Sequence, residues 1–273
     1  MPTSLLCETV IGDTMDQLLA ARDAAAAVDM VELRLDGVSD LEVDRALQGR
    51  RLPVIVTCRA KWEGGRFVGS EEQRLAVLTR ALAAGAEYVD IEWRAGFDDL
   101  VQANRSRVVL SSHHFAGMPS GLCAEARAMR AVGTALIKIA VSVSRLCDTL
   151  PLRDVAKGGN AVVIGMGDAG VPSRLLASRF GSRWTYAGNA VAPGQMPATR
   201  MLDEFRFRSI GENTAVYGFA GDDAVRSRVP AGRNAAFAAA GRDAVCIPLP
   251  ASDTGDIEAF TQAVGILEWE RCT

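Results

Sequence analysis

Amine and imidazole side chains are scarce in this sequence of 273 residues. Lys61, Lys138 and Lys157 are its only lysines, so 27 of the 30 basic side chains are arginines, and its two histidines are the neighbours His113 and His114. Chemistry that needs an amine nucleophile or an imidazole acid–base group therefore has very few candidates.

Paired cysteines are lacking too. The sequence contains no CxxC motif, and no cysteine spacing suits zinc alongside the two histidines. We therefore expect reduced thiols and no metal site. The six cysteines are Cys7, Cys58, Cys123, Cys147, Cys246 and Cys272.

Long apolar runs and excess positive charge are also missing. No stretch of about 18 apolar residues occurs, and the N-terminus lacks the basic and apolar regions of a signal peptide. A net charge of −3 and a pI near 5.6 give no electrostatic reason to expect a nucleic acid or an anionic membrane as partner. We expect a cytoplasmic globular protein without either partner, while association into a homodimer stays open.

Short apolar runs rich in β-branched residues alternate with stretches of helical spacing, such as residues 71–84 and 123–131. A parallel neighbour is reached only by a long return connection, so this alternation predicts parallel strands joined by helices. Eight units within about 210 residues favour an α/β fold of the (βα)8 TIM-barrel type over an open doubly wound sheet. The predicted strands begin at Leu5, Met30, Pro53, Tyr88, Arg107, Ala135, Asn160 and Arg183.

The pattern starts again after the barrel. We expect a barrel domain over residues 1–211, followed by a small βαβ-like segment over residues 212–273. In that segment TAVYGFAG and DAVCIPLP read as strands, and AGRNAAFAAAG reads as a helix that ends on glycine.

Lys138 lies within the apolar run ALIKIAV. Both faces of a parallel barrel strand are covered, so the amine is expected to be desolvated. Burial lowers the pKa of a lysine, and the neutral amine can attack a ketone. The alternative is a lysine at the strand end that reaches water or pairs with a carboxylate.

His113 ends the preceding predicted strand, RVVLSSHH, and is expected at the same mouth of the barrel. Its imidazole could remove and return a proton, whereas a hydrogen-bonded histidine at a strand end is the structural alternative. Glu32, Arg34, Arg59 and Glu63 bring charge of both signs to strand ends, which suits a small hydroxylated anion or salt bridges at the barrel end.

Gly165, Gly167 and Gly170 match the GxGxxG pattern of dinucleotide-binding loops. The acidic residue expected about 20 positions later is missing, because residues 171–200 contain no Asp or Glu. We interpret the glycines instead as a tight loop that brings Ser173 and Arg174 to the mouth of the barrel.

Taken together, the motifs resemble in order and spacing those of type I 3-dehydroquinate dehydratases over residues 5–201. They are VELRLD, TCRAKWEGG, YVDIEW, SSHHF, IKIAV, GMGDAGVPSR and APGQ. Each motif is weak alone, but the set is specific. The resemblance implies a hydro-lyase of the shikimate pathway that converts 3-dehydroquinate to 3-dehydroshikimate and water, through a lysine Schiff base and without a cofactor.

The resemblance also implies residue roles. Lys138 forms the Schiff base, His113 transfers protons, and Glu63 matches the partner of the histidine. Arg174 binds the substrate carboxylate. The hydroxyls and ring of the substrate are held by residues that match Glu32, Arg34, Arg59 and Gln195.

Two positions depart from the family pattern: His114 stands where the family commonly has Asp, and Val191 where a serine is often found. Residues 212–273 resemble the start of a shikimate dehydrogenase, but RSRVP replaces its His-Ser-Leu-Ser-Pro motif and no nucleotide-binding half follows. Truncation and decay of that domain both remain open. Class I aldolases and quinate-sensing regulators are the rival interpretations; Arg174 with the APGQ loop disfavours the first, and the presence of Lys138 with His113 disfavours the second.

Overall fold

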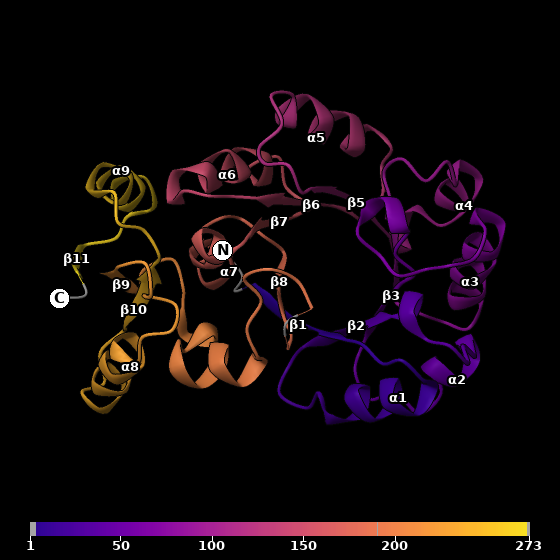
Figure 1. Cartoon of the computed structure of the whole chain (residues 1–273), viewed down its shortest axis with the longest axis horizontal. Coiled ribbons are helices and arrows are strands. Elements are labelled where there is room, and N and C mark those ends of the chain that lie inside the picture. The colour runs from indigo at the N-terminus through magenta and orange to yellow at the C-terminus, as the bar shows by residue number, and fades with distance from the viewer. Residues whose placement is uncertain (1–3, 190, 272–273) are drawn as a thin grey trace. The chain divides into compact units, whose positions relative to one another are not determined.

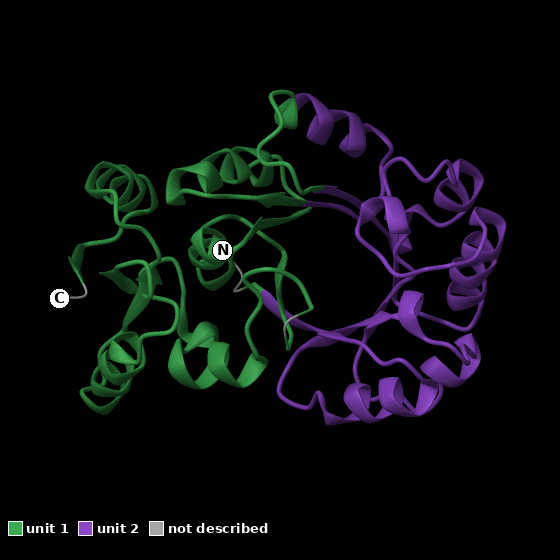
Figure 2. Cartoon of the chain, in the orientation of Figure 1, with its two compact units in different colours: residues 1–4, 114–123, 140–273 green, residues 5–113, 124–139 purple. Residues whose placement is uncertain are grey.

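The computed structural model of the chain (Figure 1) describes residues 4–189 and 191–271. Cys272, which we expect to be reduced, lies outside the described residues. The described chain forms two compact units (Figure 2). Unit 1 contains residues 1–4, 114–123 and 140–273, and unit 2 contains residues 5–113 and 124–139.

Eight strands form one sheet in the order β7-β6-β5-β4-β3-β2-β1-β8. Neighbouring strands from β1 to β5 pair in parallel. The two end strands of this order, β7 and β8, lie in unit 1, where the backbone N–H of Arg183 donates to the carbonyl of Ala161 at 2.8 Å. The predicted (βα)8 barrel class is thereby confirmed. The strands are β1 (Leu5–Val10), β2 (Met30–Arg34), β3 (Val54–Thr57), β4 (Tyr88–Glu92), β5 (Val108–His114), β6 (Leu136–Ser142), β7 (Ala161–Met166) and β8 (Trp184–Ala187).

The strands are buried along nearly their whole length, as parallel strands covered on both faces must be. Register places polar positions beside one another at the carboxyl ends of the strands in unit 2. Thr9 pairs with Glu32, Thr57 pairs with Asp90, and Glu92 is opposite Ser111. These polar side chains therefore meet at one end of the sheet.

Helices connect the strands, and local sequence signals start several of them. Thr14 caps the first helix by accepting from the N–H of Gln17, and Ser70 and Gln73 form a reciprocal capping box on the third. The helices are α1 (Met15–Ala24), α2 (Val43–Leu47), α3 (Glu71–Ala83), α4 (Asp98–Ala103), α5 (Leu122–Ala131), α6 (Leu150–Ala156) and α7 (Val171–Leu175).

A second, three-stranded parallel sheet follows within unit 1, in the order β10-β9-β11. The two predicted strands and the helix between them are confirmed, and the chain adds a second helix and a third strand. Figure 1 shows the two helices on opposite sides of the small sheet. These elements are β9 (Ala215–Ala220), α8 (Val229–Ala239), β10 (Ala244–Leu249), α9 (Thr254–Val264) and β11 (Glu268–Arg271).

Candidate active site

Lys138 lies near the middle of β6 and is 5% exposed. Its Nζ is 3.1 Å from Oε1 of Glu32 and 3.0 Å from Oδ2 of Asp90, both of which are also buried. The predicted burial of the amine is confirmed. Pairing with two carboxylates agrees with the ion-paired alternative, and the catalytic interpretation of this lysine stays a prediction.

Glu32 lies in β2 and is fixed from both neighbouring strands. One carboxylate oxygen accepts from Oγ1 of Thr9 at 3.0 Å, and the other accepts from Oγ1 of Thr57 at 2.9 Å. Lys138 is the third partner of Glu32, so this carboxylate could move away from the amine only by breaking buried hydrogen bonds.

Arg59 is the central cation of unit 2. Its guanidinium donates to Asp90 at 2.8 Å, to Glu92 at 3.0 Å, to Oγ of Ser111 at 2.9 Å and to Glu63 at 3.4 Å. Burial alone would lower the pKa of Arg59, but the surrounding carboxylates outweigh it and raise that pKa. Arg59 therefore stays charged and organises the acidic groups around it.

Asp90 is completely buried between two cations. Burial would raise its pKa, but Arg59 and Lys138 hold the pKa of this carboxyl well below its usual range. Oγ of Ser111 donates a further hydrogen bond to Asp90 at 2.6 Å. Asp90 is thus an ionised carboxylate in contact with the amine of Lys138.

Glu92 links this cluster to the surrounding helices. It accepts from Arg59, from the backbone N–H of Ala60 at 3.2 Å and from Arg74, whose side chain is fully buried on α3. Arg74 also stacks over the ring of Phe97, with 4.6 Å between Cζ and the ring centroid. The charged end of the sheet is therefore anchored through α3.

His113 and Glu63 form a second buried pair. Nδ1 of His113 lies 2.9 Å from Oε2 of Glu63, and the histidine side chain is 12% exposed. Burial, followed by the charges of Arg59 and Lys138, lowers the pKa of His113 well below 6.5. Burial also raises the pKa of Glu63 to about 8, against the opposing effect of Arg59. Both shifts favour uncharged forms, so the imidazole is available as a base at neutral pH.

Arg34 is the least buried of the predicted substrate-binding residues in unit 2, with 17% of its side chain exposed. It forms a two-pronged ion pair with Asp36, at 2.8 and 2.9 Å. Burial would lower its pKa, but the hydrogen bonds and charge of Asp36 raise it. Arg34 keeps its charge and some access to solvent.

Arg174 belongs to unit 1, where it lies on α7 and is 2% exposed. Its Nη2 donates to the carbonyl of Pro193 at 3.2 Å, but no residue in the described part of the chain accepts from its buried Nε. Burial lowers the pKa of Arg174 to about 10. A buried guanidinium with so few partners is suited to an anion.

Gln195 lies in the same unit and supports the loop that contacts Arg174. Its Oε1 accepts from the backbone N–H of Ala192 at 2.9 Å, and its Nε2 donates to the carbonyl of Ala187 at 3.3 Å. These bonds tie the APGQ loop to the end of β8. Gln195 therefore stabilises this loop, and it is also a candidate substrate contact.

The glycine-rich loop after β7 is a close backbone crossing. A Cβ on Gly170 would lie 2.3 Å from the backbone of Gly165, and Gly167 has a φ of +90°. Ser173, which we expected at the mouth with Arg174, is fully buried, accepts from the N–H of Gly165 and donates to the carbonyl of Gly170. The hydroxyl of Ser173 therefore closes the loop, and its place at the mouth of the barrel stays a prediction.

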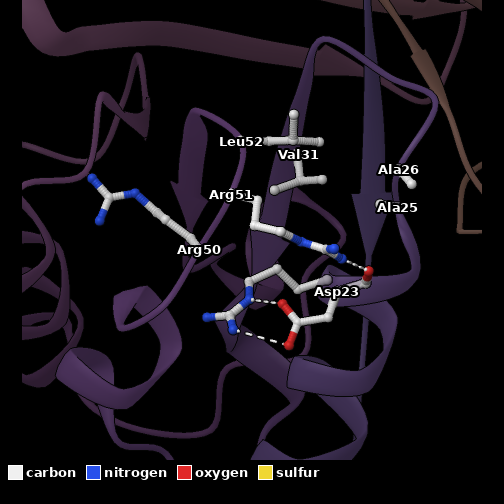
Figure 3. A pocket seen from close by; sticks show the side chains of 8 residues that line it. Asp23, Ala25, Ala26, Val31, Arg50, Arg51 and Leu52 are labelled. Carbon is white, nitrogen blue, oxygen red and sulfur yellow. Dashed lines mark hydrogen bonds and ion pairs between the residues drawn. The ribbon is translucent and has the colours of Figure 1, made fainter.

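A small cavity of about 140 Å³ lies at the opposite, amino-terminal end of the strands in unit 2 (Figure 3). The arginines that line this cavity donate hydrogen bonds to backbone carbonyls. Arg22 binds Asp23 and the carbonyls of Ala46 and Gln48, while Arg51 donates to the carbonyl of Asp23. This end of a barrel usually serves stability, and these contacts fit that role.

Sequence reasoning missed Asp90, Ser111 and Arg74 as parts of the charged cluster. A signal for the first was present, since Asp90 and Glu92 are two residues apart in YVDIEW and must share one face of a strand. Two carboxylates on one face of a buried strand require cations nearby.

Comparisons with known proteins show the family of the chain. A family model described as type I 3-dehydroquinase matches residues 6–212. The chain is 34% identical over 203 residues to the 3-dehydroquinate dehydratase of Methanothermobacter thermautotrophicus, covering 70% of this chain and 91% of that protein. It is also 32% identical over 256 residues to the chloroplastic bifunctional 3-dehydroquinate dehydratase/shikimate dehydrogenase of Arabidopsis thaliana, covering 86% of this chain but only 42% of that protein.

Solved structures show the same fold. The type I 3-dehydroquinate dehydratase of Clostridium difficile gives a TM-score of 0.65 at 22% identity, covering 74% of this chain and 90% of that one. The dehydroquinate dehydratase and shikimate dehydrogenase of S. pombe AroM gives 0.64 at 19% identity, covering 95% of this chain and 55% of that one. In the described residues, no helix is long and apolar enough to cross a membrane. With its family match over most of its length, the chain belongs to the type I 3-dehydroquinase family.

Proposed function

We propose that the protein is a 3-dehydroquinate dehydratase of the shikimate pathway, which forms 3-dehydroshikimate and water through a Schiff base on Lys138. The observation that carries this proposal is the buried amine of Lys138 between Glu32 and Asp90, in the same unit as the hydrogen-bonded pair His113 and Glu63. An amine and an acid–base pair are the groups that an imine-dependent elimination needs.

The first step is attack of Lys138 on the substrate ketone. An amine attacks only in its neutral form, and the carboxylate of Glu32, 3.1 Å from Nζ, is near enough to accept the proton. Glu32 returns this proton as the addition product loses one water, which leaves a protonated imine. The positive imine withdraws electrons from the adjacent carbon and so acidifies its C–H bond.

His113 then removes a proton from that carbon, and the electron pair forms an enamine. The low pKa of His113 keeps the imidazole in its basic form before this step. The enamine expels the neighbouring hydroxyl, which takes the proton back from His113 and leaves as water. Hydrolysis of the imine by another water releases the product and restores the amine.

Glu63 acts through His113. Its carboxyl, 2.9 Å from Nδ1, fixes the orientation and tautomer of the ring so that Nε2 is the nitrogen that exchanges protons with substrate. For Nε2 to accept a proton, Nδ1 must carry the ring hydrogen and donate it to Oε2 of Glu63. Burial raises the pKa of Glu63 to about 8, so this carboxyl ionises near that pH, and its negative charge then stabilises the protonated imidazole.

For substrate binding, Arg174 is the proposed anchor of the carboxylate, because its buried guanidinium has few partners among the described residues. Glu32, Arg34, Arg59 and Gln195 are the proposed contacts of the hydroxyls and ring. Arg59 already binds four acceptors, which supports an indirect role in which it fixes Glu63 and Asp90. The proposed mechanism requires neither a metal nor an organic cofactor.

The test is the absorbance change that accompanies formation of dehydroshikimate on addition of 3-dehydroquinate. We expect turnover with the native chain and none with Lys138→Met, which keeps the length of the side chain but has no nucleophile. Lys157→Met, at an exposed lysine paired with Asp154, is the matched control and should retain full turnover. Full turnover by Lys138→Met would exclude the Schiff base.

Three further proposals concern the chain as a whole: a domain boundary at Gly211, a cytoplasmic location and a homodimeric state. The family match ends at residue 212, whereas the similarity to the bifunctional protein of Arabidopsis thaliana covers 86% of this chain, and the two together support the boundary as a sequence unit. Light scattering of the purified chain tests the homodimer, and fractionation of cells tests the location.

A further inference from the structure

We propose that residues 212–273 position Arg174, and that Arg179 is the residue through which they do so. The inference rests on the proposed role of Arg174 as the carboxylate anchor. It assigns the C-terminal segment, whose sequence resembles another enzyme, a part in substrate binding by the dehydratase. All residues involved belong to unit 1.

The helix that carries Arg174 is covered by the C-terminal segment. All five residues of α7 are buried, and α7 contacts β10, whose six residues are also buried. The next two residues, Leu176 and Ala177, are completely buried as well. Because α7 also contacts β7 and β8, its backbone is held between strands of the barrel and residues that follow the family match.

Arg174 depends on that backbone for its position. Its side chain is held by one hydrogen bond, to Pro193, within the described residues, and its Nε has no acceptor there. A side chain with so few bonds of its own takes its place from the Cα that bears it. A small displacement of α7 would therefore move the guanidinium.

Arg179 fastens the turn after α7 to the C-terminal segment. Its Nη1 donates to the carbonyls of Val264 and Gly265, at 3.3 and 3.2 Å, and its Nη2 donates to the carbonyl of Thr214. Val264 is the last residue of α9, and Gly265 has a left-handed conformation with φ +72°. A cation at the end of a helix also interacts favourably with the partial negative charge there.

Other contacts hold the same segment in place but lie away from α7. The buried carboxylate of Asp256, in the first turn of α9, accepts from the backbone N–H groups of Leu146 at 2.8 Å and Cys147 at 3.1 Å. Asn234 on α8 donates to the carbonyls of Glu204 at 2.8 Å and Cys246 at 2.9 Å. The segment is thus attached at several points, and among the hydrogen bonds of the described residues those of Arg179 are the attachment nearest in sequence to Arg174.

The test uses the full chain and steady-state kinetics with 3-dehydroquinate. We expect Arg179→Met to raise KM about tenfold while leaving kcat nearly unchanged, because a misplaced anchor weakens binding without removing the groups that react. Borohydride trapping at saturating substrate should label Lys138 as in the native chain. Arg233→Met is the matched control, since Arg233 on α8 pairs with Glu270 within the C-terminal segment itself; its KM should stay at the native value.

The variant Arg174→Met distinguishes the proposed anchoring role of Arg174 from the proposed positioning role of Arg179. If this variant has the native KM, the proposed role of Arg174 fails. If it raises KM but Arg179→Met does not, only the positioning role is overturned. In a chain with both substitutions the KM should match that of Arg174→Met alone, because a missing anchor cannot be displaced; a further tenfold rise would also overturn the positioning role.

A milder variant covers the case in which Arg179→Met does not fold. Arg179→Lys keeps the cation near the end of α9 but loses the planar fork that reaches three carbonyls. We expect a rise in KM of several-fold, smaller than that of Arg179→Met, with native kcat. A native KM in folded Arg179→Lys protein, together with unfolded Arg179→Met protein, would show that Arg179 serves stability alone and would overturn the proposal.

Discussion

The buried charges of unit 2 and the buried Arg174 of unit 1 differ in how many hydrogen-bond and ion-pair partners they have. Arg59 touches four acceptors, and Lys138 and Asp90 are each paired, so the charges in unit 2 balance one another without substrate. Arg174 is equally buried but has one hydrogen bond to a described residue, and burial lowers its pKa. The proposed function accounts for this difference: the groups in unit 2 are the ones proposed for the chemistry, and Arg174 is the one proposed to bind an anion.

The largest expected effect on the rate is that of substituting His113, which lies among the buried groups of unit 2. His113→Ala should lower the rate by about 10² to 10⁴, because the proton transfer is lost. Imine formation can survive, so a stalled adduct on Lys138 should be visible by mass spectrometry. His114→Ala should cost much less, since successive side chains on β5 point to opposite faces. Equal losses in both variants would show that His113 is not the acid–base group.

Removing one charge from the balanced cluster should destabilise the fold. Asp90→Asn takes away the carboxylate that both Arg59 and Lys138 contact, and an uncompensated buried charge typically costs about 3–5 kcal/mol. Denaturant unfolding measures this loss. Asp44→Asn, which removes an exposed partner of Arg80, is the control and should change the free energy of unfolding by less than about 1 kcal/mol.

The pH dependence distinguishes the two members of the His113–Glu63 pair. Because the pKa of His113 is lowered, its basic form persists as the pH falls through 6.5, and we expect the acid limb of kcat only below that value. The raised pKa of Glu63 predicts a second change in rate near pH 8. In Glu63→Gln the change near pH 8 should disappear, because the amide does not titrate. A profile that falls at 6.5, or an unchanged limb near pH 8 in the variant, would contradict these assignments.

The smallest expected effect on stability belongs to Arg174. Arg174→Met should leave the free energy of unfolding unchanged or raise it by about 1 kcal/mol, because the substitution removes a buried charge with few partners and keeps the apolar stem. A loss of stability as large as that of Asp90→Asn would mean that Arg174 is needed for the fold. The contrast between Arg174 and the paired charges of unit 2 would then disappear.

Much of the candidate site in unit 2 could be predicted from the sequence. The eight strands followed from apolar runs, and Lys138 and His113 stood out because amines and imidazoles are so rare in this chain. Their placement at one end of a sheet followed from parallel strand geometry. Glu63 was expected among the charges at strand ends, but its role as partner of His113 came only from the family resemblance, and the structure places it 2.9 Å from His113.

The rest depends on contacts between distant residues. Asp90 looked like part of an alternating strand, and only the register beside Thr57 and the reach of Arg59 show that it meets Lys138. Arg179 and Asp256 bind backbone groups about a hundred positions away in the chain, which no local pattern encodes. Such contacts also explain why the described residues after 211, which the sequence predicts to be a separate segment, belong to the same compact unit as β7 and β8.

The most direct test of the central claim is reduction with borohydride in the presence of 3-dehydroquinate, followed by peptide mass spectrometry. An imine is reduced to a stable secondary amine, so we expect loss of activity and a substrate-derived mass on the peptide that contains Lys138. Borohydride without substrate should leave the chain unmodified. A label on Lys61 or Lys157, or none on Lys138 while turnover continues, would contradict the Schiff-base mechanism.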